Sequence, residues 1–175
     1  TLTLGGVGNT TFDGTIGGTG ALIKDGAGVQ TLGGANTFSG GVTLNAGGLV
    51  VGNNAALGTG ALNVAGNGSL DANAAVTLAN NVALGAGATL DVLGNNDLTL
   101  AGAVSGAGGL TKDGAATLTL AGGGKHALVI GLGGLGQIAV QILTALTGAT
   151  VIATDTREDA MQRAAANGAV TVAGG

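Results

Sequence analysis

The chain has 175 residues, a formal net charge of -4 and 39 glycines, and it contains neither cysteine nor proline. The acidic balance leaves no basic surface for nucleic acid, and the lack of cysteine excludes disulfides and thiolate metal ligands. Because only 8% of the residues are charged and the mean hydropathy is +0.54, the glycine content does not indicate disorder. We expect an ordered chain whose core consists of Leu, Val, Ile and Ala.

The first residues, Thr1-Leu2-Thr3-Leu4, form a polar and apolar alternation with no Met and no charged-then-apolar leader. We therefore expect a fragment without a signal peptide. A later stretch, residues 127–154, carries no formal charge, but four glycines between residues 131 and 136 argue against a membrane span.

Residues 1–124 contain an internal repeat. The segment 20–32 returns as 109–120, and both copies keep the pattern Leu-x-Lys-Asp-Gly. A period of two residues is typical of strands that bury one face. Alternations of this kind, three to five residues long, lie between the copies at residues 42–44, 49–51, 62–64, 76–78, 82–84, 90–92 and 98–100.

Glycine and asparagine separate these strands, as at Asn53-Asn54, Asn80-Asn81 and Asn95-Asn96. Both residue types tolerate a positive φ, so we expect them to turn the chain within one or two residues. Strands this short can be stabilised as stacked turns, with like residues above like and hydrogen-bonded ladders of Asn and Thr. A right-handed parallel β-helix, or solenoid, is the economical arrangement. An antiparallel β-sandwich or a flatter β-roll is the alternative.

Residues 19–51 resemble a known family. Leu22-Ile23-Lys24-Asp25-Gly26 is followed by Thr31-Leu32, by Asn36-Thr37-Phe38-Ser39-Gly40-Gly41 and by Val42-Thr43-Leu44. This order resembles the passenger-associated repeat of bacterial autotransporters, and the same style extends over residues 1–122. The resemblance implies a secreted β-helical stalk with a structural or surface function, located at the bacterial cell surface.

Chemically active groups are sparse in this half of the chain. Its six Asp and two Lys are spread along the sequence, and we expect the Lys-Asp-Gly triplets to lie in solvated turns. Ser39 and Ser105 lack the Gly-x-Ser-x-Gly pattern of a nucleophile elbow, and residues 5–10 lack the Asp of a calcium-binding β-roll. The residues therefore predict neither catalysis nor a metal site here.

A different pattern begins after residues 123–126. Ala127-Leu128-Val129-Ile130 is a continuous apolar run, typical of a strand buried on both faces. Gly131-x-Gly133-x-x-Gly136 follows, and apolar residues then recur at steps of three and four, which predicts a helix that stops at Gly148. Residues 149–154 predict the next strand.

In this context the glycine pattern predicts a dinucleotide site. Gly131 permits the tight turn, Gly133 lets the backbone approach a pyrophosphate, and Gly136 allows the helix and strand to pack closely. Asp155 follows the second strand, where a carboxylate binds the ribose hydroxyls and favours NAD over NADP. The predicted cofactor-binding residues are Gly131, Gly133, Gly134, Leu135, Gly136, Asp155, Thr156 and Arg157.

Thr156 and Asp159 predict a capping box for a second helix, from about Arg157 to Ala166. Asn167-Gly168 closes this helix before a third strand near residues 169–172. The stretch 125–173 resembles the cofactor domain of zinc-type, medium-chain alcohol dehydrogenases, in which Gly-x-Gly-Gly-Leu-Gly and a strand ending in Asp recur. The resemblance implies a partial α/β Rossmann unit of βαβαβ order from a cytoplasmic oxidoreductase family.

The sequence departs from that dehydrogenase family in the parts that perform the reaction. The zinc ligands would come from a separate preceding domain, but the preceding segment here consists of β-repeat sequence without Cys. The half of the sheet that supplies the nicotinamide pocket is missing as well. We expect no zinc, no turnover and weak binding of the adenosine side of NAD only. His126 is expected to be an ordinary strand-edge residue.

The predicted organisation is a β-helical segment at 1–122, a junction at 123–126 and a partial dinucleotide-binding segment at 127–175. Because the junction interrupts the second repeat copy midway, we interpret the chain as a chimera. Two functions stay open: a non-catalytic structural fragment, and an NAD(H)-binding remnant of an alcohol dehydrogenase. The predicted partners are a dinucleotide and, through exposed sheet edges, further copies of the chain, with no nucleic acid and no membrane span.

Overall fold

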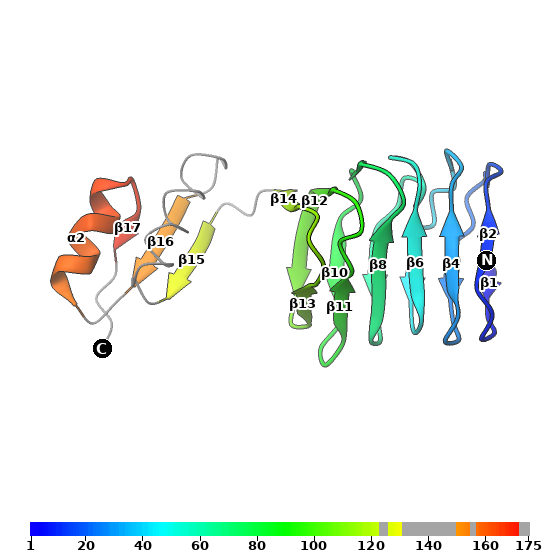
Figure 1. Ribbon diagram of the computed structural model, residues 1–175, viewed down its shortest axis with the longest axis horizontal. Coiled ribbons are helices and arrows are strands. Elements are labelled where there is room, and N and C mark those ends of the chain that lie inside the picture. The colour runs from blue at the N-terminus through cyan, green and yellow to red at the C-terminus, as the bar shows by residue number, and fades with distance from the viewer. Residues whose placement is uncertain (123–125, 131–149, 155–156, 172–175) are drawn as a thin grey trace. The chain divides into compact units, whose positions relative to one another are not determined.

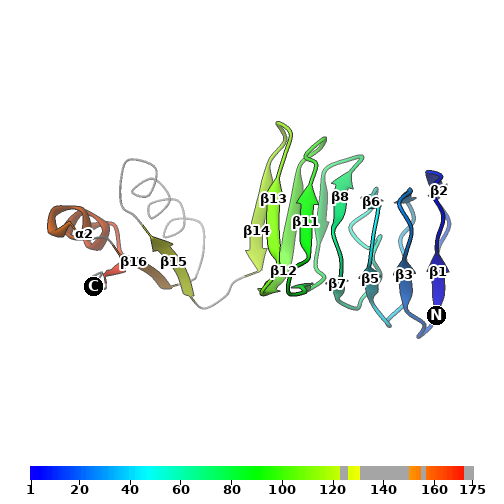
Figure 2. The same cartoon turned by 90° about the horizontal axis from the view of Figure 1, so that it is seen from below.

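The computed structural model describes residues 1–122, 126–130, 150–154 and 157–171. The chain divides into two units, Thr1–Gly122 and Gly123–Gly175. In the first unit, short strands stack in successive turns, and every strand pairs in parallel with the strand one turn before or after it (Figures 1 and 2). This is a parallel β-solenoid, so the prediction of stacked turns is confirmed and the antiparallel sandwich is not observed.

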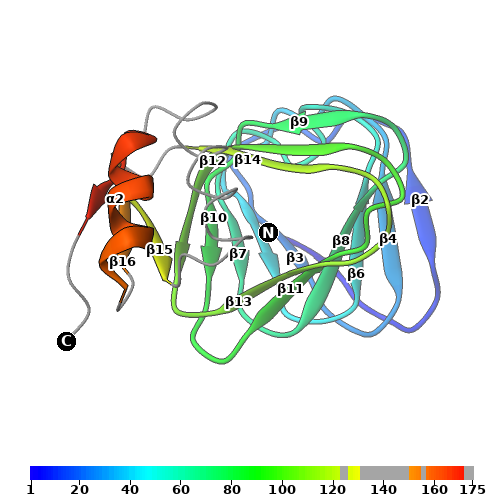
Figure 3. The same cartoon turned by 60° about the vertical axis from the view of Figure 1, so that its left-hand side comes forward.

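The solenoid has three sides, which Figure 3 shows in a view along the stack. The first side holds β1 (Leu2–Leu4), β3 (Leu22–Lys24), β5 (Val42–Leu44), β7 (Leu62–Val64), β10 (Val82–Leu84) and the end of β12 (Leu98–Gly106). The second side holds six strands, one for each of six turns: β2 (Thr10–Phe12), β4 (Val29–Leu32), β6 (Gly48–Val51), β8 (Gly68–Ala72), β11 (Thr89–Val92) and β13 (Gly109–Lys112). The third side holds β9 (Val76–Leu78), the start of β12 and β14 (Leu118–Gly122).

The turns of the solenoid have a constant length in most of the stack. On the first side Leu2 pairs with Leu22, which pairs with Val42, and the column continues at the same spacing through Leu62 to Val82. The next step, from Val82 to Val104, is slightly longer. The repeat of the fold is therefore much shorter than the distance between the two Leu-x-Lys-Asp-Gly copies.

The third side changes along the stack. In the first three turns it has no assigned strand, yet the backbone ladder continues, because Thr37 N donates to Ile16 O at 2.9 Å and Thr59 N donates to Phe38 O at 3.0 Å. From β9 onward it becomes a regular sheet, and β12 runs from this side around the corner to the first side.

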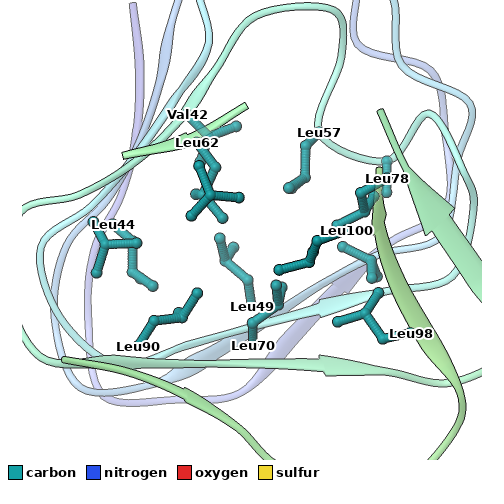
Figure 4. Packing of buried hydrophobic residues seen from close by; sticks show 14 of the residues in the cluster. Val42, Leu44, Leu49, Leu57, Leu62, Leu70, Leu78, Leu90, Leu98 and Leu100 are labelled. Atoms are coloured by element: carbon teal, nitrogen blue, oxygen red, sulfur yellow. The ribbon is translucent and has the colours of Figure 1, made fainter. Parts of the chain in front are cut away.

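The core is a set of aliphatic columns inside the stack. In most strands alternate residues point inward, and Val42, Leu62 and Leu70 are 0% exposed (Figure 4). Phe38 is the largest fully buried side chain and packs on the third side beside Gly58. Burial of each such aliphatic side chain contributes about 1.5–3 kcal/mol, so small residues suffice when every turn adds to the same columns.

The corners use glycine and not asparagine for left-handed backbone. Eleven described glycines have a positive φ, among them Gly26 at 87° and Gly58 at 65°, whereas no other described residue does. The prediction that Asn residues would adopt a positive φ is therefore wrong for the described part of the chain. Asn stays in ordinary backbone regions because its side chain, and not its φ tolerance, is what the corners use.

The second unit contains a three-stranded parallel sheet in the order β15 (His126–Ile130), β16 (Thr150–Thr154), β17 (Val170–Thr171). Helix α2 (Glu158–Ala166) connects β16 to β17 and buries Ala160 and Ala164, one turn apart. Gly168, with φ 86°, ends the helix as predicted. The N-cap is Arg157 without a side-chain cap, and Asp159 accepts a hydrogen bond from Arg163. Thr156, the first residue of the predicted capping box, lies outside the described residues.

Candidate functional site

The Lys-Asp-Gly triplet of the first repeat copy forms a corner between the first and second sides. Lys24 points into the solenoid and is 3% exposed, because its column partners are the inward residues Leu4 and Leu44. Its ammonium donates to Gly26 O at 2.7 Å and contacts Asp25 O at 3.5 Å and Ala46 O of the next turn at 3.3 Å. The prediction of a solvated triplet is therefore wrong for the lysine.

Burial changes the ionisation of Lys24. Loss of hydration lowers the pKa of its ammonium, and the neighbouring Asp25 carboxylate opposes part of that shift. Three main-chain carbonyls replace the lost water, matching the three donors of an ammonium group. The side chain thus satisfies the carbonyls of two turns from inside the corner.

The second copy builds the same corner on a different side. Lys112 donates to the carbonyls of Asp113 and Gly114, as Lys24 does to those of Asp25 and Gly26. In both corners the glycine N–H donates to the preceding Asp Oδ1, at 3.1 Å in the first copy and 2.8 Å in the second. The first corner joins the first side to the second, whereas the later one joins β13 on the second side to β14 on the third. The motif therefore specifies a corner and not a particular side.

A second recurring device is a side chain that bridges adjacent turns. Asn67 lies directly before β8, and its Oδ1 accepts from Thr89 N of the next turn at 2.9 Å. Such a bridge supplies an acceptor where the backbone bends away from the ladder. The same bridge, at 2.8–2.9 Å, runs from Asn9 to Val29, from Asn54 to Thr77, from Asn81 to Ala103 and from Asp97 to Thr117. The predicted Asn ladder is therefore a ladder between Asn side chains and the backbone.

Two buried asparagines stabilise the third side where it lacks strands. Asn36 accepts from Ile16 N of the preceding turn at 2.8 Å and donates to Ala56 O of the following turn at 2.6 Å. Asn80 donates to Gly58 O at 3.0 Å and to Gly60 O at 2.6 Å, both in the preceding turn. These bonds, made in a buried environment, replace strand pairing.

The outer surface of the solenoid carries stacked polar residues and few charges. Thr77, Thr99 and Thr119 lie in register on the third side, so threonine stacks on threonine as predicted. Asp71, in contrast, is almost buried, at 6% exposed, and accepts hydrogen bonds from the backbone and side chain of Asn95. Among the described residues, no group of three or more His, Cys, Asp or Glu is placed to bind a metal ion. In the same part of the chain, no helix is long and apolar enough to cross a bilayer.

The predicted cofactor-binding residues fall mostly outside the described residues. This applies to Gly131, Gly133, Gly134, Leu135, Gly136, Asp155 and Thr156. Arg157 is described and exposed, at the N-cap of α2. Of the neighbouring backbone, Ile130 ends β15, Thr154 ends β16, and these two residues pair across the parallel strands.

Sequence reasoning missed the residues that connect the turns. Lys24, Asn36 and Asn80 were not expected to be buried, although each is among the few polar residues that are almost fully buried. One usable signal was present, because four of the five bridging residues (Asn9, Asn67, Asn81 and Asp97) directly precede a strand. The constant length of the turn was a second signal, visible as Leu2, Leu22, Val42, Leu62 and Val82 at equal spacing.

The repeat half is similar to a known family. The family model described as passenger-associated-transport-repeat matches residues 22–51 and 110–125. The two matched segments begin at Leu22 and Leu110, the same positions at which the two lysine corners begin. No curated protein and no solved structure matches the chain.

Proposed function

We propose that residues 1–122 act as a non-catalytic, passenger-type structural stalk at a bacterial cell surface. The observation that carries the proposal is the use of buried polar groups: Lys24, Asn36 and Asn80 all bond to the backbone of an adjacent turn. Such groups stabilise the stacking of the turns. The match to the passenger repeat supports the same proposal.

The solenoid is right-handed under this proposal. Its strands are joined by crossovers between parallel partners, and connections of that kind are right-handed in nearly all proteins, because of the twist of the strands. Each turn then extends the same side-chain columns with the same handedness. A rigid stalk of this type can be lengthened by further turns without a change of chemistry.

Trypsin provides a direct test, because residues 1–122 contain only two cleavage sites, Lys24 and Lys112. The full chain would be displayed between a signal peptide and an outer-membrane anchor, and cells would be treated with trypsin. We expect cleavage after the exposed Lys112 well before cleavage after the buried Lys24. A Leu70→Asp control, with a charge in the core, should lose this difference. Equal rates at both lysines in the unaltered chain would contradict a folded surface stalk.

A second function is proposed for the other unit: binding of the adenosine side of NAD, without turnover. It is supported by the pairing of β15 with β16, which end at Ile130 and Thr154 immediately before Gly131 and Asp155 in the sequence. Ligands of open parallel sheets bind at the carboxyl ends of neighbouring strands. Such strand pairing is common to many α/β proteins, so the identity of the ligand is inferred from the glycine pattern and not from the pairing.

Calorimetry of the full chain with NAD and with ADP-ribose tests this second proposal. We expect both to bind with similar, weak affinity, because the nicotinamide half has no predicted pocket. Gly133→Val should abolish binding by blocking approach of the pyrophosphate, while Val7→Ala in the solenoid should leave it unchanged. The absence of heat at millimolar ligand would remove the dinucleotide from consideration.

A further inference from the structure

Two of the 13 asparagines lie in the sequence pattern that accepts N-linked sugars. The pattern is Asn, then any residue except Pro, then Ser or Thr, and it occurs at Asn67-Gly68-Ser69 and at Asn9-Thr10-Thr11. Asn67 directly precedes β8 and Asn9 directly precedes β2, so both lie at the corner that leads into the second side. Each also bridges to the next turn through Oδ1. The pattern therefore coincides with one of the structural devices of the solenoid.

The bridge fixes the direction of the Asn67 amide. The N–H of Thr89 can only donate, so it holds Asn67 Oδ1 at 2.9 Å and leaves Nδ2 on the opposite side of the amide. Within the described part of the chain, no group forms a hydrogen bond with this nitrogen. Because Asn67 is exposed, its Nδ2 is accessible from solvent.

The buried asparagines use the same nitrogen in the opposite way. Asn36 donates from Nδ2 to Ala56 O at 2.6 Å, and Asn80 donates from Nδ2 to Gly58 O at 3.0 Å. In both residues the nitrogen satisfies a backbone carbonyl inside the solenoid, and neither residue has Ser or Thr two positions later. The Asn67 nitrogen has no such structural role, which leaves it open to modification.

The packing around Gly68 keeps the amide and the hydroxyl of the pattern on the outer surface. Gly68 turns toward the core, where an added Cβ would lie 2.8 Å from Cδ2 of the buried Leu44. Since side chains alternate between the two faces of a strand, Asn67 and Ser69 point outward on either side of it. Ser69 is half-buried, and its hydroxyl lies beside Gly48 of the preceding turn, which has no side chain to cover it. An enzyme that approaches this corner therefore meets both groups that the pattern requires.

Attachment of a sugar to Asn67 requires the nitrogen and leaves the oxygen unchanged. The bond between Nδ2 and the anomeric carbon of a glycosyl diphosphate forms, the bond from that carbon to the diphosphate oxygen breaks, and one Nδ2 proton is released. The product is still an amide, so its Oδ1 can accept the hydrogen bond from Thr89 N as before. A bulky, hydrated group can thus be added at this corner while the contact between the turns is kept.

We propose that Asn67 is an acceptor site for N-linked glycosylation of the folded chain, with a glycosyl diphosphate as the donor. The exposed Nδ2 is the group that is modified, and the Ser69 hydroxyl completes the pattern that the transferring enzyme recognises. The sugar extends from the corner between the first and second sides. This site does not depend on whether the chain acts as a stalk, because it requires only the fold of the turns around Asn67.

Glycosylation of the purified full chain tests the proposal, with peptide mapping by mass spectrometry to read Asn67 separately from Asn9. One reaction contains a soluble asparagine glycosyltransferase and UDP-glucose, and the other contains a membrane oligosaccharyltransferase and its lipid-linked oligosaccharide. We expect the Asn67 peptide of the folded chain to gain the mass of one hexose or of the oligosaccharide, and the mass gained identifies the donor. No sugar on Asn67 in either reaction would overturn the proposal, as would modification that occurs only after heat unfolding.

Matched variants separate the acceptor pattern from the bridge. Ser69→Ala keeps the bond between Asn67 and Thr89 N, so its circular dichroism spectrum should be unchanged, yet the sugar on Asn67 should be lost. Ala83→Thr places a hydroxyl two residues after Asn81, another exposed bridging residue, and should add a sugar there. A sugar retained on Asn67 in Ser69→Ala would contradict recognition of the pattern. The unfolding temperature should be the same with and without the sugar, and a lower value with it would overturn the geometry on which the proposal rests.

Discussion

The two units use similar lengths of chain between paired strands for different purposes. In the solenoid Leu2 pairs with Leu22, and the chain between these partners passes along all three sides of a turn and contains strand β2. In the second unit Ile152 pairs with Val170, and a connection of similar length contains helix α2. The spacing of partners is therefore not what distinguishes a solenoid from a helical crossover.

The difference lies in how often the apolar pattern is interrupted. All solenoid strands except the nine-residue β12 are three to five residues long, and Gly or Asn follows within two residues, whereas α2 repeats Ala160 and Ala164 at helical spacing without interruption. The stabilising contacts differ accordingly. The solenoid bonds buried polar groups between turns, and α2 has an exposed ion pair between Asp159 and Arg163 at 2.8 Å. Substitutions should therefore have large effects in the solenoid and small ones in α2.

The largest effect is expected in the central column of the solenoid. Leu70 is 0% exposed and pairs with Leu49 and Val92 on either side. Leu70→Ala should lower the free energy of unfolding by about 2–5 kcal/mol, because it leaves a cavity in a rigid stack. Urea denaturation followed by far-ultraviolet circular dichroism measures it. Leu120→Ala, at an exposed end of a column, is the control, and equal losses from both would contradict the stacked core.

The next effect separates backbone strain from crowding at the corners. Gly58 has φ 65°, and an added Cβ would lie 2.3 Å from Phe38 O, whereas Gly87 has φ 77° and open space around it. Gly87→Ala should cost about 1–2 kcal/mol from left-handed strain alone. Gly58→Ala should cost about 1–3 kcal/mol more, from overpacking. Equal thermal shifts for the two variants would show that Phe38 does not constrain its neighbour.

A third effect concerns the two lysine corners, which have the same internal hydrogen bonds but differ in the burial of the lysine. Lys24→Met removes the donors of buried carbonyls and should cost about 1–3 kcal/mol, whereas the same change at the exposed Lys112 should be small. Since folding lowers the pKa of Lys24, the unfolded chain binds more protons above that pKa. Stability should accordingly rise with pH in the alkaline range up to the ordinary lysine pKa. Lys24→Met should remove this rise, and its persistence in the variant would assign it to another group.

The smallest effect belongs to α2. The hydrogen bond from Arg163 holds the pKa of Asp159 below its usual range, so the pair contributes above the ordinary aspartate pKa and is lost as the pH falls through the lowered value. Asp159→Asn should reduce the helical circular dichroism signal slightly near neutral pH and not at all in strong acid. Both side chains are more than half exposed. A loss of unfolding free energy as large as that expected for Leu70→Ala would therefore contradict the contrast between the units.

Much of the fold could be predicted from alternation alone. The strands around Val42, Leu62 and Leu98 appear where the apolar and polar pattern placed them, and all are parallel. The polar connections could not be predicted in the same way. Asn36 is buried because the strands of the third side are absent in the early turns, and no local pattern at residue 36 indicates this. The dinucleotide site stays a prediction.

By itself the sequence determined the strands, the glycine corners and the apolar columns, because these depend on local period and on φ tolerance. Only the tertiary structure decided which side of the stack each repeat copy occupies and that Lys24 points inward. The lysine corner has the same internal bonds at Lys24 and Lys112, so its local chemistry is fixed by Lys-Asp-Gly. Its burial differs because Ala46, one turn further on, covers Lys24, whereas Lys112 lies in the last turn of the stack.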